Sequence, residues 1–206
     1  MEDQTPLMND VPLFDPRAVN AGFDLKGAMA RVLDRHWYVM GEEVSRFEAA
    51  FAAYCGVPYC VSLANGTDAL ELALRAAGVQ AGDRVVLAAN AGYYGSTAVR
   101  QIGAVPVYAD VDADNLCLNP QAVVRALGDG ALPKVILVTH LYGQLADVES
   151  LAKIATERGI VLIEDCAQAH GARRAGKVAG SFGDLACFSF YPTKNLGAVG
   201  GGGAVV

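Results

Sequence analysis

The chain has 206 residues, of which 53% are apolar and 18% are charged, and its net charge is −6. This length fits one large domain or at most two, and the apolar fraction is typical of a sheet covered on both faces. No cluster of lysines and arginines is visible, which argues against nucleic-acid binding, and no apolar stretch is long enough to span a membrane. The N-terminus, Met1–Gln4, lacks the basic and apolar regions of a signal peptide, so we expect a cytoplasmic protein.

The N-terminal stretch differs from the rest of the chain. Pro6, Pro12 and Pro16 predict an extended arm up to about Asn20, and we place the arm at residues 1–24. From residue 25 onward, apolar runs that indicate strands alternate with helical patterns. The predicted strands are Tyr59–Ala64, Arg84–Ala88, Val105–Tyr108, Val135–Thr139, Ile160–Glu164, Leu185–Phe190 and a last one that begins at Gly203 or Ala204.

The predicted helices are Asp24–His36, Glu42–Tyr54, Asp68–Ala77, Tyr94–Ile102, a helix that begins at Pro120 and ends near Gly128, and Val148–Arg158. Asn119 and Asp147 are expected to cap the last two, and Gly159 to end the final one. Strands and helices joined by such short connections form βαβ units. The sequence therefore predicts an α/β fold with a mainly parallel seven-stranded sheet and helices on both faces.

The C-terminus is unusual, because the chain stops at Gly200–Val206, inside a predicted strand. Domains seldom end on an apolar strand without a polar tail. We therefore expect residues 25–206 to form a large domain that is incomplete at its C-terminus. The alternative is a natural short chain whose last strand pairs inside the sheet.

The cysteines indicate a reducing compartment. They are Cys55, Cys60, Cys117, Cys166 and Cys187. None forms a Cys-x-x-Cys pair and none has zinc-site spacing to a histidine, so we expect no metal site. An odd number of cysteines without a disulfide framework is typical of a reducing environment.

A lysine and an aspartate follow two of the predicted strands. Lys194 lies in Ser189–Gly197, directly after a strand, and Asp165 follows the apolar run Ile160–Ile163. Ligands of α/β proteins bind at the carboxyl ends of the strands. A lysine there can form a Schiff base with an aldehyde, and an aspartate can keep a pyridine nitrogen protonated, which are the two groups that pyridoxal phosphate requires. The alternatives are a surface lysine, and an aspartate that caps a helix or forms a structural ion pair.

A phosphate seat is predicted where a strand meets a helix at Asn65, Gly66 and Thr67. Gly66 lets the backbone approach a ligand, Thr67 offers a hydroxyl, and the helix start favours an anion. Ser189 shares a connection with Lys194, so its hydroxyl can face the same phosphate. The alternative is an ordinary helix start in which Asn65 or Thr67 caps the backbone.

Three further side chains are candidates. Gln168 can donate a hydrogen bond to the phenolic oxygen of the ring. Tyr94 or Tyr93 can stack on the ring, unless both line the core or a subunit interface. His170 can act as a proton relay, contact the substrate, or be a hydrogen-bonded structural histidine.

These motifs, in this order, resemble the DegT/DnrJ/EryC1/StrS family of fold-type I pyridoxal-phosphate enzymes, most of which are sugar aminotransferases. The likeness covers nearly the whole chain. The matching segments are Val11–Asp15, Trp37–Gly41, Glu48–Gly56, Asn65–Leu70, Asp110–Asp112, His140–Gln144, Glu164–Gly171 and Ser189–Gly197. Family members are considerably longer, and the resemblance implies that their smaller C-terminal domain is absent from this chain.

The resemblance also implies a role for each site residue. The implied cofactor-binding set is Gly66, Thr67, Tyr94, Asp165, Gln168, Ser189 and Lys194. Lys194 would carry the cofactor and later move a proton, Asp165 would hold the pyridine nitrogen, and Gln168 would contact the ring oxygen. Gly66, Thr67 and Ser189 would hold the phosphate. Tyr94 is our choice for the stacking aromatic, because Gly92 occupies the family's usual aromatic position.

The function that the resemblance implies is transfer of an amine from an amino acid, expected to be glutamate, to a keto-sugar on a nucleotide diphosphate, in amino-sugar biosynthesis. Some relatives replace the lysine with histidine and catalyse dehydration, so Lys194 favours transamination. The alternatives are a keto-cyclitol acceptor, a pyridoxal-phosphate-dependent dehydratase or lyase, and a non-catalytic partner with the same fold. We expect a homodimer, because fold-type I sites are usually built across one, and no nucleic-acid or membrane partner.

Overall fold

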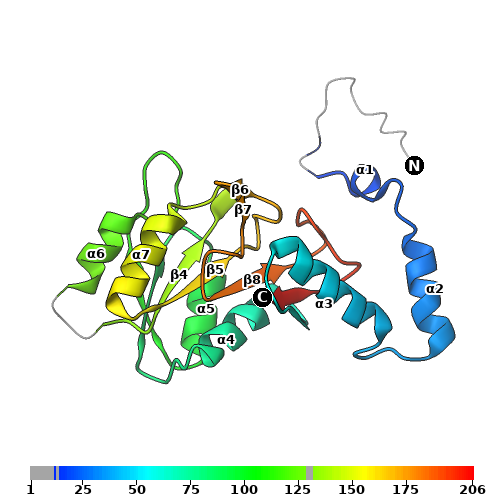
Figure 1. The fold of residues 1–206 in the computed structure, drawn as a ribbon, viewed down its shortest axis with the longest axis horizontal. Coiled ribbons are helices and arrows are strands. Elements are labelled where there is room, and N and C mark those ends of the chain that lie inside the picture. Colours follow the sequence, from blue (N-terminus) through cyan, green and yellow to red (C-terminus); the bar gives the residue numbers. More distant parts are fainter. Residues whose placement is uncertain (1–11, 13, 129–131) are drawn as a thin grey trace, which may run out of the picture. The chain divides into compact units, whose positions relative to one another are not determined.

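The computed structural model describes residues 12, 14–128 and 132–206 (Figure 1). Contacts group the chain into two units, Met1–Gly41 and Glu42–Val206. The first unit contains helices α1 (Pro16–Asn20) and α2 (Leu25–Arg35), and no residue of either helix is buried.

The predicted extended arm is wrong for part of its length, and the rest lies largely outside the described residues. Asp15 accepts hydrogen bonds from the backbone amides of Arg17 and Ala18, and Pro16 occupies the first helical position. Proline suits that position because its fixed φ is helical and its missing N–H would have had no partner. Pro16 therefore starts a short helix, and α2 falls in the first unit rather than in the large domain where we expected it.

The second unit is built on the predicted sheet. Its strands are β1 (Val61–Leu63), β2 (Arg84–Ala88), β3 (Val105–Ala109), β4 (Val135–Thr139), β5 (Val161–Asp165), β8 (Leu185–Ser189) and β9 (Gly203–Val205). Within the described residues they form a seven-stranded sheet in the order β1-β9-β8-β5-β4-β2-β3. The run from β8 to β3 is parallel, whereas β9 is antiparallel to both of its neighbours.

The helices of this unit are α3 (Glu42–Cys55), α4 (Gly66–Ala76), α5 (Tyr94–Gln101), α6 (Pro120–Leu127) and α7 (Val148–Arg158). Asn119 and Asp147 cap α6 and α7 as predicted, and Gly159 ends α7 in the left-handed conformation. A 3₁₀ turn, η1 (Leu141–Gly143), follows β4. A small hairpin of β6 (Arg173–Arg174) and β7 (Lys177–Val178) was not predicted.

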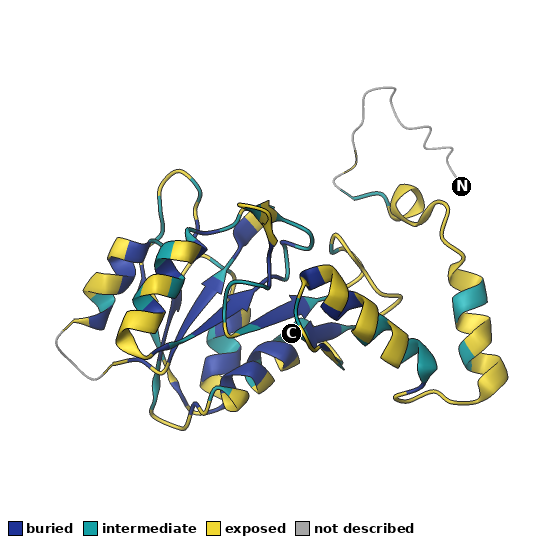
Figure 2. Ribbon diagram, in the orientation of Figure 1, coloured by how far each residue is buried: buried dark blue, intermediate teal, exposed yellow. Residues whose placement is uncertain are grey.

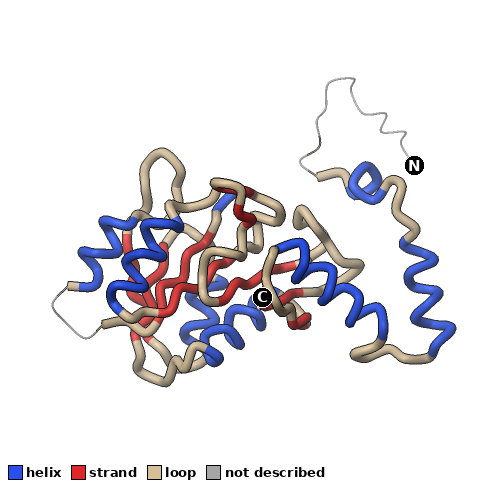
Figure 3. The backbone as a smooth tube through the Cα atoms, viewed as in Figure 1, coloured by secondary structure: helices blue, strands red, loops and turns tan. Residues whose placement is uncertain are grey.

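The core consists of apolar layers on opposite faces of the sheet. Alternate strand residues point to opposite faces, so Ile163 packs with α4 and α5 whereas Leu162 packs with α6 and α7. Figure 2 shows buried strands, and Figure 3 shows helices on both sides of them. The α/β prediction of a mainly parallel seven-stranded sheet with helices on both faces is confirmed. The parallel strands also bring the ends of β4, β5 and β8 to one edge.

No helix in the described part of the chain is both long and apolar enough to cross a membrane.

Candidate active site

A pocket of about 430 Å³ lies where the carboxyl ends of β5 and β8 meet the start of α4. Six of the seven predicted site residues line it: Gly66, Thr67, Tyr94, Asp165, Ser189 and Lys194. Side chains from distant parts of the sequence therefore converge at the edge of the sheet where α/β proteins bind ligands. Gln168 is not among the lining residues.

The start of α4 offers free backbone amides to this pocket. Asn65 is the cap, and its Oδ1 accepts from the Asp68 amide at 2.9 Å. The helix therefore begins at Gly66, two residues earlier than predicted. In the part of the chain that the structure describes, the amides of Gly66 and Thr67 have no hydrogen-bond partner. Free amides at the positive end of an eleven-residue helix suit an anion.

Ser189 approaches this helix start closely because residue 66 is glycine. A Cβ at position 66 would lie 2.6 Å from Ser189 Cβ, which is too close for two non-bonded carbons. Any other residue would push β8 away from α4. Gly66 thus brings the Ser189 hydroxyl to the same seat as the free amides.

Asp165 is a buried carboxylate without a cationic partner. Its side chain accepts from Thr139 Oγ1 at 3.2 Å and from the Ala167 amide at 3.1 Å. Burial raises its pKa, although these two hydrogen bonds and the charge of the nearby Lys194 amine oppose the shift. No ion pair joins Asp165 to another described residue. A cation placed beside this carboxylate would stabilise its charged form.

Lys194 lies on the tight connection between β8 and β9. Its amide donates to the Tyr191 carbonyl at 2.8 Å, and a Cβ at Gly197 would lie 2.6 Å from the Pro192 carbonyl oxygen. Only glycine therefore permits this turn. The Lys194 side chain is half-buried, and its amine forms no hydrogen bond or ion pair within the described residues. The amine is thus available to a ligand in the pocket.

Gln168 is held by a neighbouring turn. Its Oε1 accepts from the Tyr142 amide at 2.7 Å, and Tyr142 has a left-handed φ of 56°. This bond fixes which end of the amide is the acceptor. Among the described residues Nε2 has no partner, so its two N–H groups remain for a ligand.

The two candidate tyrosines form an exposed pair. Their rings stack with centroids 4.7 Å apart, and Tyr94 lines the pocket whereas Tyr93 does not. Tyr93 is 70% exposed and Tyr94 52%, so neither belongs to the core of the second unit. The geometry favours Tyr94 as the ring that can face a ligand.

His170 does not line this pocket and forms no side-chain hydrogen bond within the described residues. Its ring packs 5.4 Å from Phe188 and 5.5 Å from Phe190, and both ring nitrogens are buried without a partner among the described residues. Burial lowers the pKa of His170 to about 4, although the nearby Ser189 backbone opposes the shift. His170 is therefore a neutral packing residue at neutral pH.

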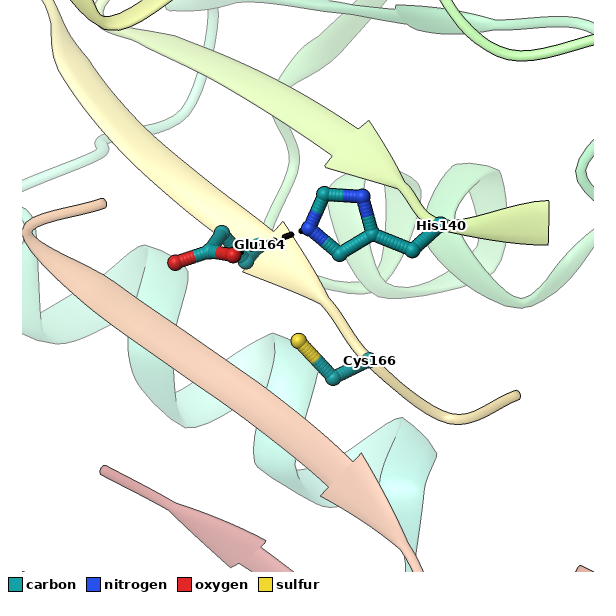
Figure 4. A group of neighbouring side chains, drawn as sticks. All are labelled: His140, Glu164 and Cys166. Atoms are coloured by element: carbon teal, nitrogen blue, oxygen red, sulfur yellow. Dashed lines mark hydrogen bonds and ion pairs between the residues drawn. The ribbon is translucent and has the colours of Figure 1, made fainter. Parts of the chain in front are cut away.

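Sequence reasoning missed a buried group next to the site. His140, Glu164 and Cys166 place their polar atoms within 4.8 Å of one another, as Figure 4 shows. His140 Nε2 lies 2.8 Å from Glu164 Oε2. Thr139, which donates to Asp165, was also missed, because only the register of β4 with β5 brings the two residues together.

Comparisons with known proteins agree with this geometry. The model of the DegT/DnrJ/EryC1/StrS aminotransferase family matches residues 22–206. A dTDP-3-amino-3,4,6-trideoxy-alpha-D-glucose transaminase of Micromonospora megalomicea subsp. nigra is 44% identical over 89% of this chain and 48% of its own length. An L-glutamine:2-deoxy-scyllo-inosose aminotransferase of Streptomyces kanamyceticus is 42% identical over 86% of this chain and 43% of its own.

A solved structure matches the fold as well. DesV of S. venezuelae, in complex with a ketimine intermediate, superimposes with a TM-score of 0.90 at 41% identity, covering 95% of this chain and 53% of that one. The chain spans about half the length of the curated relatives it matches.

Proposed function

Because this chain belongs to the DegT/DnrJ/EryC1/StrS aminotransferase family, we propose that it is part of a pyridoxal-phosphate-dependent aminotransferase. The observation that carries the proposal is one pocket that holds a free lysine amine, a buried unpaired carboxylate and free helix amides. These groups match the aldehyde, the ring nitrogen and the phosphate of this cofactor.

The phosphate is the first test of fit. The free amides of Gly66 and Thr67 and the Ser189 hydroxyl converge at the start of α4. Together they offer donors and the positive end of a helix dipole to an anion. We assign the phosphate to these residues.

Asp165 and Lys194 carry the chemistry. The bound cofactor supplies an aldehyde that reacts with amines and a ring that withdraws electrons from the bonds of the attached substrate. Asp165 would accept a hydrogen bond from the ring nitrogen and keep it protonated, which would also offset the cost of burying the carboxylate. Lys194 would hold the aldehyde, and its amine would move a proton at the substrate carbon.

Gln168 and Tyr94 orient the ring. The Gln168 Nε2 group, left free by the bond from Tyr142 to Oε1, would donate to the phenolic oxygen of the cofactor. The exposed Tyr94 ring, which lines the pocket, would stack on the cofactor ring.

The substrates are proposed from the family. We assign glutamate as the donor and a keto-sugar on a nucleotide diphosphate as the acceptor, since the relative from M. megalomicea is named for a dTDP-amino-sugar. A keto-cyclitol acceptor is the second candidate, and the inosose aminotransferase of S. kanamyceticus favours it.

We also propose a homodimer in the cytoplasm. Within the first unit Phe23, Trp37, Val39 and Met40 are each at least 62% exposed, and a partner subunit would cover such apolar side chains. The cysteines are all buried and free, which agrees with a reducing compartment.

Isotope transfer tests the proposal. The full-length protein with pyridoxal phosphate and glutamate labelled with ¹⁵N at its amine is incubated with nucleotide-linked keto-sugars and, separately, with keto-cyclitols. We expect the label in the amine of one product class, and no transfer by Lys194→Ala. Cofactor binding without transfer to any acceptor would instead support the non-catalytic alternative.

A further inference from the structure

A dense hydrogen-bond network lies behind Asp165, on the opposite face of β5. Glu164 and His140 are both fully buried. Glu164 accepts from the amides of Phe182 and Gly183 at 2.8 Å each, from the Gly180 amide at 3.0 Å, and from His140 at 2.8 Å. This carboxylate therefore joins β5 to His140 and to the segment before β8 (Figure 4).

The direction of each bond is fixed. The Ala146 amide donates to His140 Nδ1 at 3.2 Å, so the ring proton is on Nε2 and is donated to Glu164. Burial alone would raise the pKa of Glu164, but the bonds from His140, Gly183 and Gly180 lower it below its usual value. Both ring nitrogens of His140 are thus hydrogen-bonded, and Glu164 has a donor at each of its two oxygens.

The network reaches Asp165 by two routes. The His140 amide donates to the Asp165 carbonyl at 3.0 Å, so His140 is bonded to β5 at its backbone and at its ring. Thr139, the preceding residue, is in register with Asp165 and donates to its carboxylate at 3.2 Å. Moving His140 therefore moves both the strand end and the hydroxyl that hold Asp165.

A metal ion fits this cluster poorly. The His140 and Glu164 atoms that could bind one are already bonded to each other. Burial raises the pKa of the Cys166 thiol well above its usual value, so the thiolate that a metal prefers is disfavoured.

We propose that Glu164 and His140 are positioning residues that hold Asp165 and Thr139 in place for the ring nitrogen of the cofactor. This proposal rests on the proposed function, because it acts through the contact between Asp165 and the cofactor. Neither residue lines the pocket, so the effect is indirect.

The test is a double-mutant cycle for pyridoxal-phosphate affinity in the full-length protein. In Glu164→Gln, one carboxylate oxygen is replaced by an NH₂ group. Whichever way the amide is turned, this group faces two N–H donors and can accept from neither. We expect Glu164→Gln to weaken cofactor binding about tenfold, as loss of such supporting contacts does at other sites. In an Asp165→Asn background the same change should cost less than about twofold, because the pair acts only through Asp165. Equal losses in both backgrounds would overturn the proposal.

Two controls make the result specific. Leu151→Ala creates a cavity beneath α7, so it lowers stability without touching the network and should leave cofactor affinity unchanged. Hydrogen exchange at His140 and Ala167, whose amides both bond Asp165, should accelerate in Glu164→Gln but not in Leu151→Ala. Unchanged exchange at both amides would also refute the proposal.

The remaining outcomes distinguish failure of the proposed function from failure of the positioning role. If Asp165→Asn alone leaves cofactor affinity unchanged, the proposed function fails and the exchange data decide whether the pair holds Asp165. If Glu164→Gln does not fold, His140→Gln, which spares the three amide bonds of Glu164, takes its place with the same expectation. One equivalent of zinc in the purified protein, lost in the variant, would show a metal site and contradict the proposal.

Discussion

Replacing Gly66 with alanine tests the geometry of the phosphate seat. Gly66 is the first residue of α4, and its φ is not in the left-handed region, so the backbone itself accepts alanine. The obstacle is Ser189, whose Cβ would lie 2.6 Å from the added methyl group. Non-bonded carbons prefer about 3.5–4.0 Å, so β8 and α4 must separate by roughly 1 Å.

The magnitude follows from two opposing effects. Inserting a methyl group into a packed site costs about 1–3 kcal/mol, whereas alanine gains less than about 1 kcal/mol over glycine at a helix start. We therefore expect Gly66→Ala to lower the free energy of unfolding by about 1–2 kcal/mol. A displaced Ser189 also loses a hydrogen bond to a charged phosphate, worth about 1.5–3 kcal/mol, so pyridoxal-phosphate affinity should fall about ten- to a hundredfold.

Urea unfolding of the cofactor-free protein and a fluorescence titration with pyridoxal phosphate measure the two effects. Ser189→Gly removes the Cβ that the new methyl group meets. The double variant Gly66→Ala/Ser189→Gly should regain stability relative to Gly66→Ala alone, but not affinity, because the hydroxyl is gone. A Gly66→Ala protein as stable and as tightly binding as the parent would refute the reasoning, as would a double variant without recovered stability.

Three other predictions test single side chains. Tyr94→Ala should weaken pyridoxal-phosphate binding about three- to tenfold through lost stacking, whereas Tyr94→Phe should bind within about twofold of the parent; equal losses would contradict a stacking role. In Gln168→Glu the new side chain still accepts from the Tyr142 amide but cannot donate, so titration should show a pyridoxal-phosphate affinity about tenfold lower. An unchanged affinity would exclude a hydrogen bond from Gln168 to the phenolic oxygen. The pKa of His170 falls from 6.5 to about 4 on folding, so the unfolded chain binds its proton first as the pH drops. The unfolding free energy should then fall by up to about 3 kcal/mol between pH 6.5 and pH 4, and His170→Phe should remove that part of the slope in urea titrations.

The sequence predicted the sheet well where local signals and burial agree. Strands β2 and β4 have the predicted bounds because each contains four consecutive apolar residues that are buried whichever face of the sheet they point to. Helix α7 has the predicted bounds because Asp147 and Gly159 mark its two ends. The hairpin of β6 and β7 was missed because two-residue strands carry no periodic pattern.

The site was predicted as a set of residues but not as a network. Lys194 and Asp165 could be predicted because Asp165 ends one buried strand and Lys194 follows another, and parallel strands end at the same edge. The roles of Thr139 and His140 depend on which strands are neighbours and on the register of β4 with β5, which local sequence does not encode. The start of α4 was predicted two residues too late because the sequence left open whether Asn65 or Thr67 caps the helix, and the bond from the Asp68 amide identifies Asn65.

The most direct test of the central claim is the visible absorption of the full-length protein with pyridoxal phosphate, recorded before and after glutamate is added. Lys194→Ala serves as the control. We expect a yellow band that depends on Lys194 and that glutamate converts to the spectrum of pyridoxamine phosphate. A band that is absent, or that responds neither to glutamate nor to the loss of Lys194, would contradict the proposed function.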